Sequence, residues 1–113
     1  MEIWLNKRIL LNNVKICNNL FSKLKGFMFS RRREGILFEL SRESKELAAI
    51  HMLFVFFPLD VYWLNKDFKV VDLKLNVKPF RIHVAPKKKA KYILETPANS
   101  IKQSLLGKKL EIR

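Results

Sequence analysis

One apolar run in this chain contains side chains that could do chemistry. It extends from Ile50 to Asp60, with His51 near its start and the carboxylate of Asp60 at its end. An imidazole can exchange protons near neutral pH, and a carboxylate can orient such an imidazole, as in catalytic triads. Trp63 could form the floor and Arg81 the rim of a pocket beside this pair. Such a pocket would suit a carboxylate, a phosphate or a sugar.

The same residues also have structural interpretations. A histidine in an apolar run is commonly a core residue hydrogen-bonded to the backbone or to a carboxylate, and an aspartate after Pro-Leu commonly caps a turn. No partner nucleophile is evident, and the sequence does not place His51 within the roughly 3 Å of Asp60 that proton transfer requires. We therefore favour structural roles and keep a ligand-binding or catalytic pocket at His51 and Asp60 as the alternative.

Several other kinds of chemistry are excluded by composition. Cys17 is the only cysteine, and with His51 and His83 it gives neither a disulfide nor a zinc-binding spacing. We expect no metal, no cofactor and a reducing cytoplasm as the compartment. The first eight residues lack a basic n-region and an apolar h-region, so no signal peptide is expected. The apolar run is shorter than the roughly 20 residues of a membrane helix, so no membrane partner is expected.

The strongest anomaly is charge, because 23 basic residues face only 10 acidic ones, for a formal net charge of +13. Such an excess favours polyanionic partners, and basic clusters that converge could bind phosphate backbones through counterion release. Short charge runs also occur on solvated loops, and no recognition helix or RNA-recognition motif is present. The candidate polyanion-binding residues are Arg31, Arg32, Arg33, Lys78, Lys87, Lys88, Lys89 and Lys91.

The elements that must position these residues are mostly strands. Residues 3–5 and 8–11 flank Asn6-Lys7 as in a hairpin, and residues 14–16, 36–40, 61–64, 68–77, 91–95 and 110–112 have strand patterns. Residues 48–57 read as a strand buried on both faces at the centre of the sheet, and residues 41–46 as a charged loop. One short helix is expected from Asn18 and a second from Thr96-Pro97 to Gly107. The 113 residues thus predict a single mainly β domain, a compact antiparallel β-barrel or sandwich-like sheet with two short helices.

Four segments carry a resemblance to a known family. They are Gly26-Phe27-Met28-Phe29-Ser30-Arg31, Gly35-Ile36-Leu37-Phe38, His51-Met52 leading into Pro58-Leu59-Asp60-Val61, and Ala90-Lys91-Tyr92-Ile93-Leu94-Glu95. In their order and spacing the chain resembles the domain of unknown function 192 family. Pro79-Phe80-Arg81 and Ile50-His51-Met52 resemble its archaeal branch. The resemblance implies a small β-rich fold and no established biochemical activity.

Two departures limit what the resemblance implies. Leu53-Phe54-Val55 stands where bacterial members have Lys-Asn-Thr, so a polar site built on those residues is absent here. Asn99 stands where they have a glycine, and asparagine tolerates a left-handed backbone better than most residues.

These observations predict a cytoplasmic binding or accessory module for a polyanionic partner, the backbone of RNA or DNA, and not an enzyme. A pocket around His51 and Asp60 for a small ligand is the alternative. A third possibility is a subunit or chaperone-like interaction domain with an apolar edge. The sequence leaves the oligomeric state open.

Overall fold

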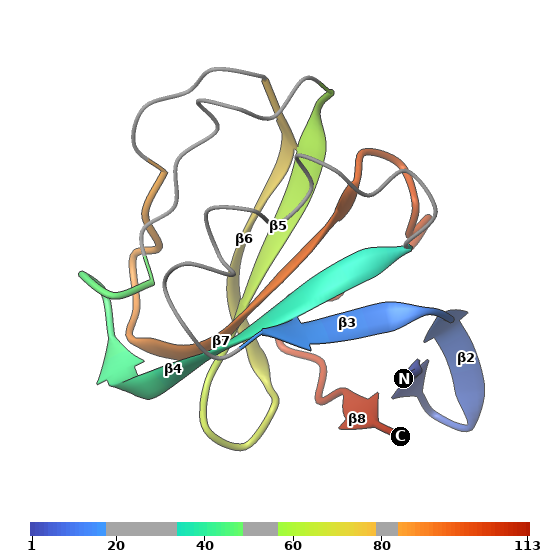
Figure 1. Ribbon diagram of the computed structural model, residues 1–113, viewed down its shortest axis with the longest axis horizontal. Helices are drawn as coiled ribbons and strands as arrows, with labels where there is room; N and C mark the ends of the chain where they lie inside the picture. The colour runs from blue at the N-terminus through green and yellow to red at the C-terminus, as the bar shows by residue number, and fades with distance from the viewer. Residues whose placement is uncertain (18–33, 49–56, 79–83) are drawn as a thin grey trace.

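The computed structural model describes residues 1–17, 34–48, 57–78 and 84–113, which form two β-sheets (Figure 1). A five-stranded sheet has the order β3-β4-β7-β5-β6, and a three-stranded sheet has the order β2-β1-β8. The strands are β1 (Ile3–Leu5), β2 (Arg8–Leu11), β3 (Val14–Cys17), β4 (Gly35–Ser44), β5 (Leu59–Leu64), β6 (Val70–Val77), β7 (Ala90–Pro97) and β8 (Glu111–Ile112).

The larger sheet is built around β7, which pairs antiparallel with β4 on one side and with β5 on the other. All six residues of β5 are buried, as expected for an apolar strand covered on both faces. β6 forms an antiparallel hairpin with β5, and β3 lies parallel to β4. Among the described residues, the outer strands β3 and β6 each have a neighbour on one side only, so the sheet formed by this part of the chain is open.

The smaller sheet begins with a tight hairpin between β1 and β2. Its two loop residues, Asn6 and Lys7, have φ angles of 49° and 67°, the left-handed pair that a type I′ turn requires. β8 pairs with the other side of β1, and Glu2 and Arg113 exchange backbone hydrogen bonds of 2.7 and 2.9 Å. Residues from the two ends of the sequence therefore lie side by side (Figure 1).

Alternation along the strands divides the core into two layers. One layer lies between the two sheets and contains Ile3, Leu37, Tyr62 and Leu94. The other covers the opposite face of the larger sheet and is organised around Trp63, which has no exposed surface. The larger sheet is thus a shared wall between two apolar layers.

The expectation of a mainly β fold is confirmed. The expectations of a barrel and of a purely antiparallel sheet are wrong, because the described strands form two sheets and β3 is parallel to β4. The described residues contain no helix. The helix expected from Thr96 to Gly107 is wrong because β7 continues to Pro97, which pairs with Leu59 of β5, and a turn follows. Strand pairing there outweighs the local helix signal. The helix expected from Asn18 falls on residues 18–33, outside the described residues.

Two further expectations about the strands need correction. β4 extends to Ser44, so most of the predicted loop at residues 41–46 belongs to a strand. Asp60 lies within β5 and not in a turn after Pro58. Most of the predicted central strand, residues 48–57, lies outside the described residues.

Candidate functional site

Asp60, one of the two candidate chemical groups, is a buried carboxylate bound to two backbone N–H groups. Its Oδ1 accepts a hydrogen bond from Asn76 N at 2.8 Å and its Oδ2 accepts one from Asn99 N at 3.0 Å. Only 3% of the residue is exposed. Both oxygens therefore already have donors within the protein.

The two donors sit where strand pairing is interrupted. Leu59 pairs with Val77 and Val61 with Lys74, so a bulge in β6 lies opposite Asp60. Both donor residues have left-handed backbones, with φ of 55° at Asn76 and 67° at Asn99. At Asn99 this agrees with the expectation that the asparagine adopts a conformation that glycine would otherwise supply. Asp60 thus ties the β6 bulge to the turn after β7.

Trp63 is positioned away from Asp60. Side chains alternate along a strand, so residues 60 and 63 of β5 face opposite sides of the sheet. Trp63 donates its Nε1–H to Ala48 O at 2.8 Å and packs in the layer around Val61 and Ile93. The structure therefore does not bring Asp60 and Trp63 into one pocket. His51 and Arg81 lie outside the described residues, so the proximity of His51 to Asp60 stays a prediction.

Tyr62 shares the face of β5 on which Asp60 lies. Burial of the phenol, together with the charge of Asp60, raises the pKa of Tyr62 to about 12. Both effects disfavour the phenolate, so this hydroxyl is neutral at physiological pH. Among the described residues no group of three or more His, Cys, Asp or Glu side chains could hold a metal ion.

Carboxylates of the described residues mostly bind backbone N–H groups or neutral side chains. The ion pairs between described residues are Lys91 with Glu39 at 3.9 Å and Arg113 with Glu111 at 2.9 Å. Four carboxylates accept from backbone N–H groups instead: Asp60 from Asn76 and Asn99, Asp72 from Leu73 and Lys87, Glu34 from Asn12, and Glu43 from Lys66. Much of the limited negative charge therefore stabilises the fold without pairing with lysines.

Part of the predicted basic set gathers beside β6. Backbone N–H of Lys87 donates to Asp72 Oδ2 at 2.8 Å, which fixes the exposed segment from Lys87 to Lys89 against this strand. Lys74 is half-buried two residues after Asp72. On the other side of Asp72, Lys69 forms an isolated bridge with Lys109. Lys69 is about 10 Å from Asp72 at the rise of a strand.

We call this set the β6-edge lysines, because its members lie on or beside the outer strand of the larger sheet. They are Lys69, Lys74, Lys87, Lys88, Lys89 and Lys109.

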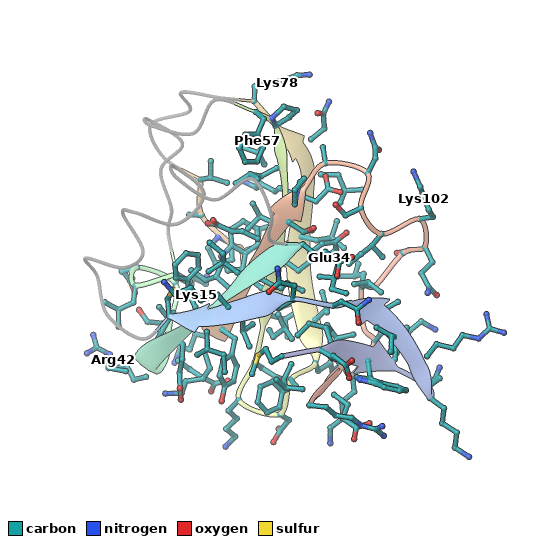
Figure 2. The ribbon with its side chains drawn as sticks, turned by 45° about the vertical axis from the view of Figure 1, so that its right-hand side comes forward. Lys15, Glu34, Arg42, Phe57, Lys78 and Lys102 are labelled. Atoms are coloured by element: carbon teal, nitrogen blue, oxygen red, sulfur yellow. The ribbon has the colours of Figure 1, made fainter. Side chains whose placement is uncertain are left out.

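The remaining predicted cations are separate from this set or outside the described residues. Lys78 lies at the far end of β6, about 20 Å from Asp72 at the rise of a strand (Figure 2). Lys91 donates to Leu40 O and lies near Glu39, so its charge is partly compensated. Arg31, Arg32 and Arg33 fall in the range that the structure does not describe.

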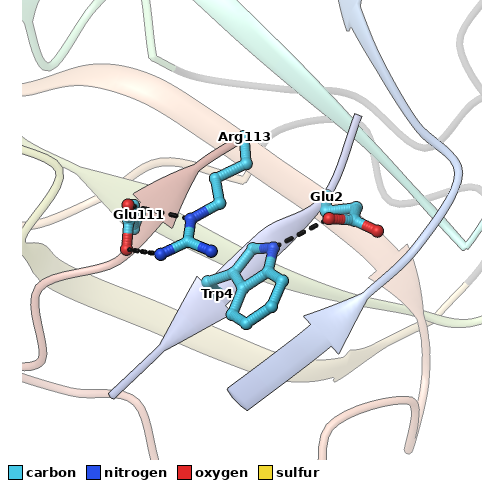
Figure 3. A network of polar contacts seen from close by, with 4 residues as sticks. All are labelled: Glu2, Trp4, Glu111 and Arg113. Carbon is cyan, nitrogen blue, oxygen red and sulfur yellow. Dashed lines mark hydrogen bonds and ion pairs between the residues drawn. The ribbon is translucent and has the colours of Figure 1, made fainter. Parts of the chain in front are cut away.

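A groove that the sequence did not predict lies at the Lys109 end of the β6-edge lysines. Its volume is about 670 Å³, and its walls include Trp4, Phe68, Lys7 and Lys109. Arg113 lies over the Trp4 ring at 4.1 Å from its centre and is paired with Glu111, while Trp4 Nε1 donates to Glu2 at 2.9 Å (Figure 3). The walls come from three segments of the sequence, and Lys7, Phe68 and Lys109 are 61 and 41 residues apart, so no local pattern could have revealed them.

No helix of the described residues has the length and apolarity needed to cross a bilayer.

Comparisons with known proteins support the fold and give the family. Residues 3–112 match the family DUF192, described as "Uncharacterized ACR". A UPF0127 protein of Pyrococcus horikoshii is 36% identical over 92 residues, covering 81% of this chain and 77% of the relative. A UPF0127 protein of Pyrococcus furiosus is 39% identical over 88 residues, covering 78% of this chain and 74% of the relative.

Two solved structures share the fold, each with a TM-score of 0.74. One, from Sinorhizobium meliloti, is described as a "putative transcription regulator". It is 20% identical, and the match covers 87% of this chain and 79% of that protein's chain. The other is a protein of unknown function from Novosphingobium aromaticivorans, 21% identical, covering 88% of this chain and 74% of its own. At these identities the likeness concerns the fold alone. The family match and the Pyrococcus relatives together show that the chain is an archaeal-type member of the DUF192 family, whose biochemical function is uncharacterised.

Proposed function

We propose that the protein is a non-enzymatic binding or accessory module whose partner is a polyanion, the phosphate backbone of RNA or DNA. The proposal includes a cytoplasmic location, which a single buried cysteine favours. The observation that carries it is the use of carboxylates by the fold. The chain has 23 basic residues and only 10 acidic ones. Each carboxylate that accepts hydrogen bonds from backbone N–H groups is one carboxylate fewer for ion pairs with lysine or arginine.

The β6-edge lysines supply the binding surface. Five of the six are exposed, and Asp72, the carboxylate between them, directs both oxygens to backbone N–H groups at 2.8 Å. Flexible ammonium groups bind phosphates as point charges and need no fixed geometry. An edge strand with lysines also avoids pairing with another sheet, so the same residues keep the protein from aggregating.

The test uses two double variants with the same formal net charge. The first is Lys88→Gln with Lys89→Gln, which removes two β6-edge lysines. The control is Lys15→Gln with Lys102→Gln, since Lys15 lies on β3, the opposite outer strand, and Lys102 is exposed elsewhere (Figure 2). Each variant lowers the formal charge from +13 to +11. Fluorescence polarisation with labelled RNA and DNA from about 50 to about 200 mM salt measures affinity and its salt dependence.

We expect the unmodified protein to bind with a steep salt dependence. Removing two phosphate contacts should lower the slope of log affinity against log salt by about 2, while the control should keep its slope. Equal losses in both variants would show that binding follows net charge and not this surface. Absence of binding at low salt would refute the proposed function.

A further inference from the structure

The groove beside Trp4 and Phe68 has the composition of a site for a flat anionic ligand. Its volume of about 670 Å³ falls within the roughly 300–1,000 Å³ of ligand pockets. Two aromatic rings and two lysines contribute to its walls. Aromatic rings stack on nucleobases, and lysines beside them can contact the flanking phosphates.

Both rings are held in place before any ligand arrives. Phe68 stacks on Tyr92 with ring centres 4.4 Å apart and planes at 22°. Trp4 has the Arg113 guanidinium over one face, and its Nε1–H is bound to Glu2 (Figure 3). A site with ordered side chains loses less conformational entropy on binding than one whose rings must first be immobilised.

Three cations (Lys7, Lys109 and Arg113) and two carboxylates (Glu111 and Glu2) lie at the groove, an excess of one positive charge. Glu111 forms two hydrogen bonds with the Arg113 guanidinium, at 2.9 and 3.3 Å. Glu2 is engaged by Trp4. Lys7 and Lys109 are exposed and form no ion pair with another described residue, which leaves their charges available to an anion.

Left-handed turn residues line part of the groove. Six non-glycine residues of the described part have positive φ, and three of them, Asn6, Lys7 and Phe68, line this groove. Phe68 has φ of 63°, a rare conformation for a bulky side chain. Hydrogen bonds fix it there, since Phe68 N donates to Asn65 O at 3.0 Å and Phe68 O accepts from Leu110 N at 2.9 Å. The loop that joins β5 and β6 therefore fixes the position of the Phe68 ring at the groove.

From these observations we propose that the groove binds an unpaired nucleobase of a single-stranded nucleic acid, with Lys7 and Lys109 on the adjacent phosphates. Lys109 also belongs to the β6-edge lysines, so the same nucleic-acid strand could continue from the groove along β6. This inference rests on the proposed function and adds a preference for single strands, because a base stacked in a duplex cannot enter the groove.

The experiment compares three labelled DNAs at low salt. The first is an oligothymidylate of about 12 nucleotides, a length typical of single-strand-binding surfaces. The second is an abasic strand of the same length and charge, and the third is a duplex of the same length. We expect the oligothymidylate to bind at least about fivefold more tightly than the abasic strand, which is the low end of the contribution of base stacking.

Tryptophan fluorescence provides a second readout. The chain has two tryptophans, and Trp63 has no exposed surface, so a change on binding should come from Trp4. Oligothymidylate should quench this fluorescence to saturation. In Trp4→Phe, binding measured by polarisation should persist because a ring remains, while the quenching should disappear. Trp4→Leu should bind the oligothymidylate only as weakly as the unmodified protein binds the abasic strand.

Lys7→Gly removes a groove cation without threatening the fold. Glycine is favoured at this left-handed turn position, so the melting temperature should stay the same or rise while affinity falls. Lys15→Gln, which removes one charge on the opposite outer strand, is the matched control and should bind more tightly than Lys7→Gly.

Two results would overturn the inference. Equal affinity for the oligothymidylate and the abasic strand, with unchanged tryptophan fluorescence, would remove the base site and leave the polyanion proposal intact. No binding to any of the three DNAs at low salt would remove both.

Discussion

Replacing Asp60 with asparagine should destabilise the protein strongly if its carboxylate is a structural brace. The substitution keeps one oxygen acceptor but turns an amide group, itself a donor, toward either Asn76 N or Asn99 N. One charge-assisted hydrogen bond is then lost, and a partly buried N–H is left without its acceptor. Hydrogen bonds to charged groups contribute about 1.5–3 kcal/mol, and an unsatisfied buried group costs about 1–3 kcal/mol.

These two effects overlap, so we expect a loss of about 3 kcal/mol in the free energy of unfolding. An unfolding entropy of about 2.1 cal/mol/K per residue gives about 0.24 kcal/mol/K for this chain, which corresponds to a melting temperature lower by about 12 °C. Thermal and urea unfolding followed by circular dichroism measure both quantities. The comparison variant is Asp72→Asn, because Asp72 also accepts from two backbone N–H groups, each at 2.8 Å.

Asp72 is partly exposed, so water can replace a lost partner there and the expected loss is about 1 kcal/mol. A loss at Asp60→Asn no larger than that at Asp72→Asn would refute the bracing role. Asp60 would then be free to act on a ligand, as in the alternative pocket with His51.

Two further predictions concern stability. The pKa of tyrosine is about 10 in the unfolded chain and that of Tyr62 is about 12 in the fold, so the unfolded state loses its proton first as pH rises. The free energy of unfolding should therefore be unaffected by ionisation of Tyr62 below pH 10 and should fall by about 2 kcal/mol by pH 12. Urea unfolding at each pH measures this loss, which Tyr62→Phe should lack. An equal loss in both proteins would show that other groups cause it. Gly35→Ala would place a Cβ 3.1 Å from Glu95 O and 3.4 Å from Leu11 Cδ1, so it should lower the free energy of unfolding by about 1–2 kcal/mol, whereas an increase would mean that β4 shifts freely.

Local patterns in the sequence determined most of the strands. Apolar and polar residues alternate, and turn residues separate them, so the hairpin at Asn6-Lys7 and the hairpin of β5 and β6 were predicted almost at their observed bounds. The basic excess and the family resemblance were also readable, because composition and short motifs do not depend on folding. The position of Lys87 to Lys89 in a loop before β7 follows in the same way.

What only the tertiary structure decided are the long-range relations. Pairing of Pro97 with Leu59 carries β7 into the first two residues of the segment where a helix was expected, because a buried strand partner outweighs a helix cap, and a turn follows. Asp60 acquires its two donors from residues 16 and 39 positions away, which no pattern around Pro58 encodes. The groove likewise requires Trp4, Phe68 and Lys109 to meet across three chain segments. Sequence periodicity reports which face of a strand is buried, whereas the neighbours of that strand are chosen by the packing of the whole chain.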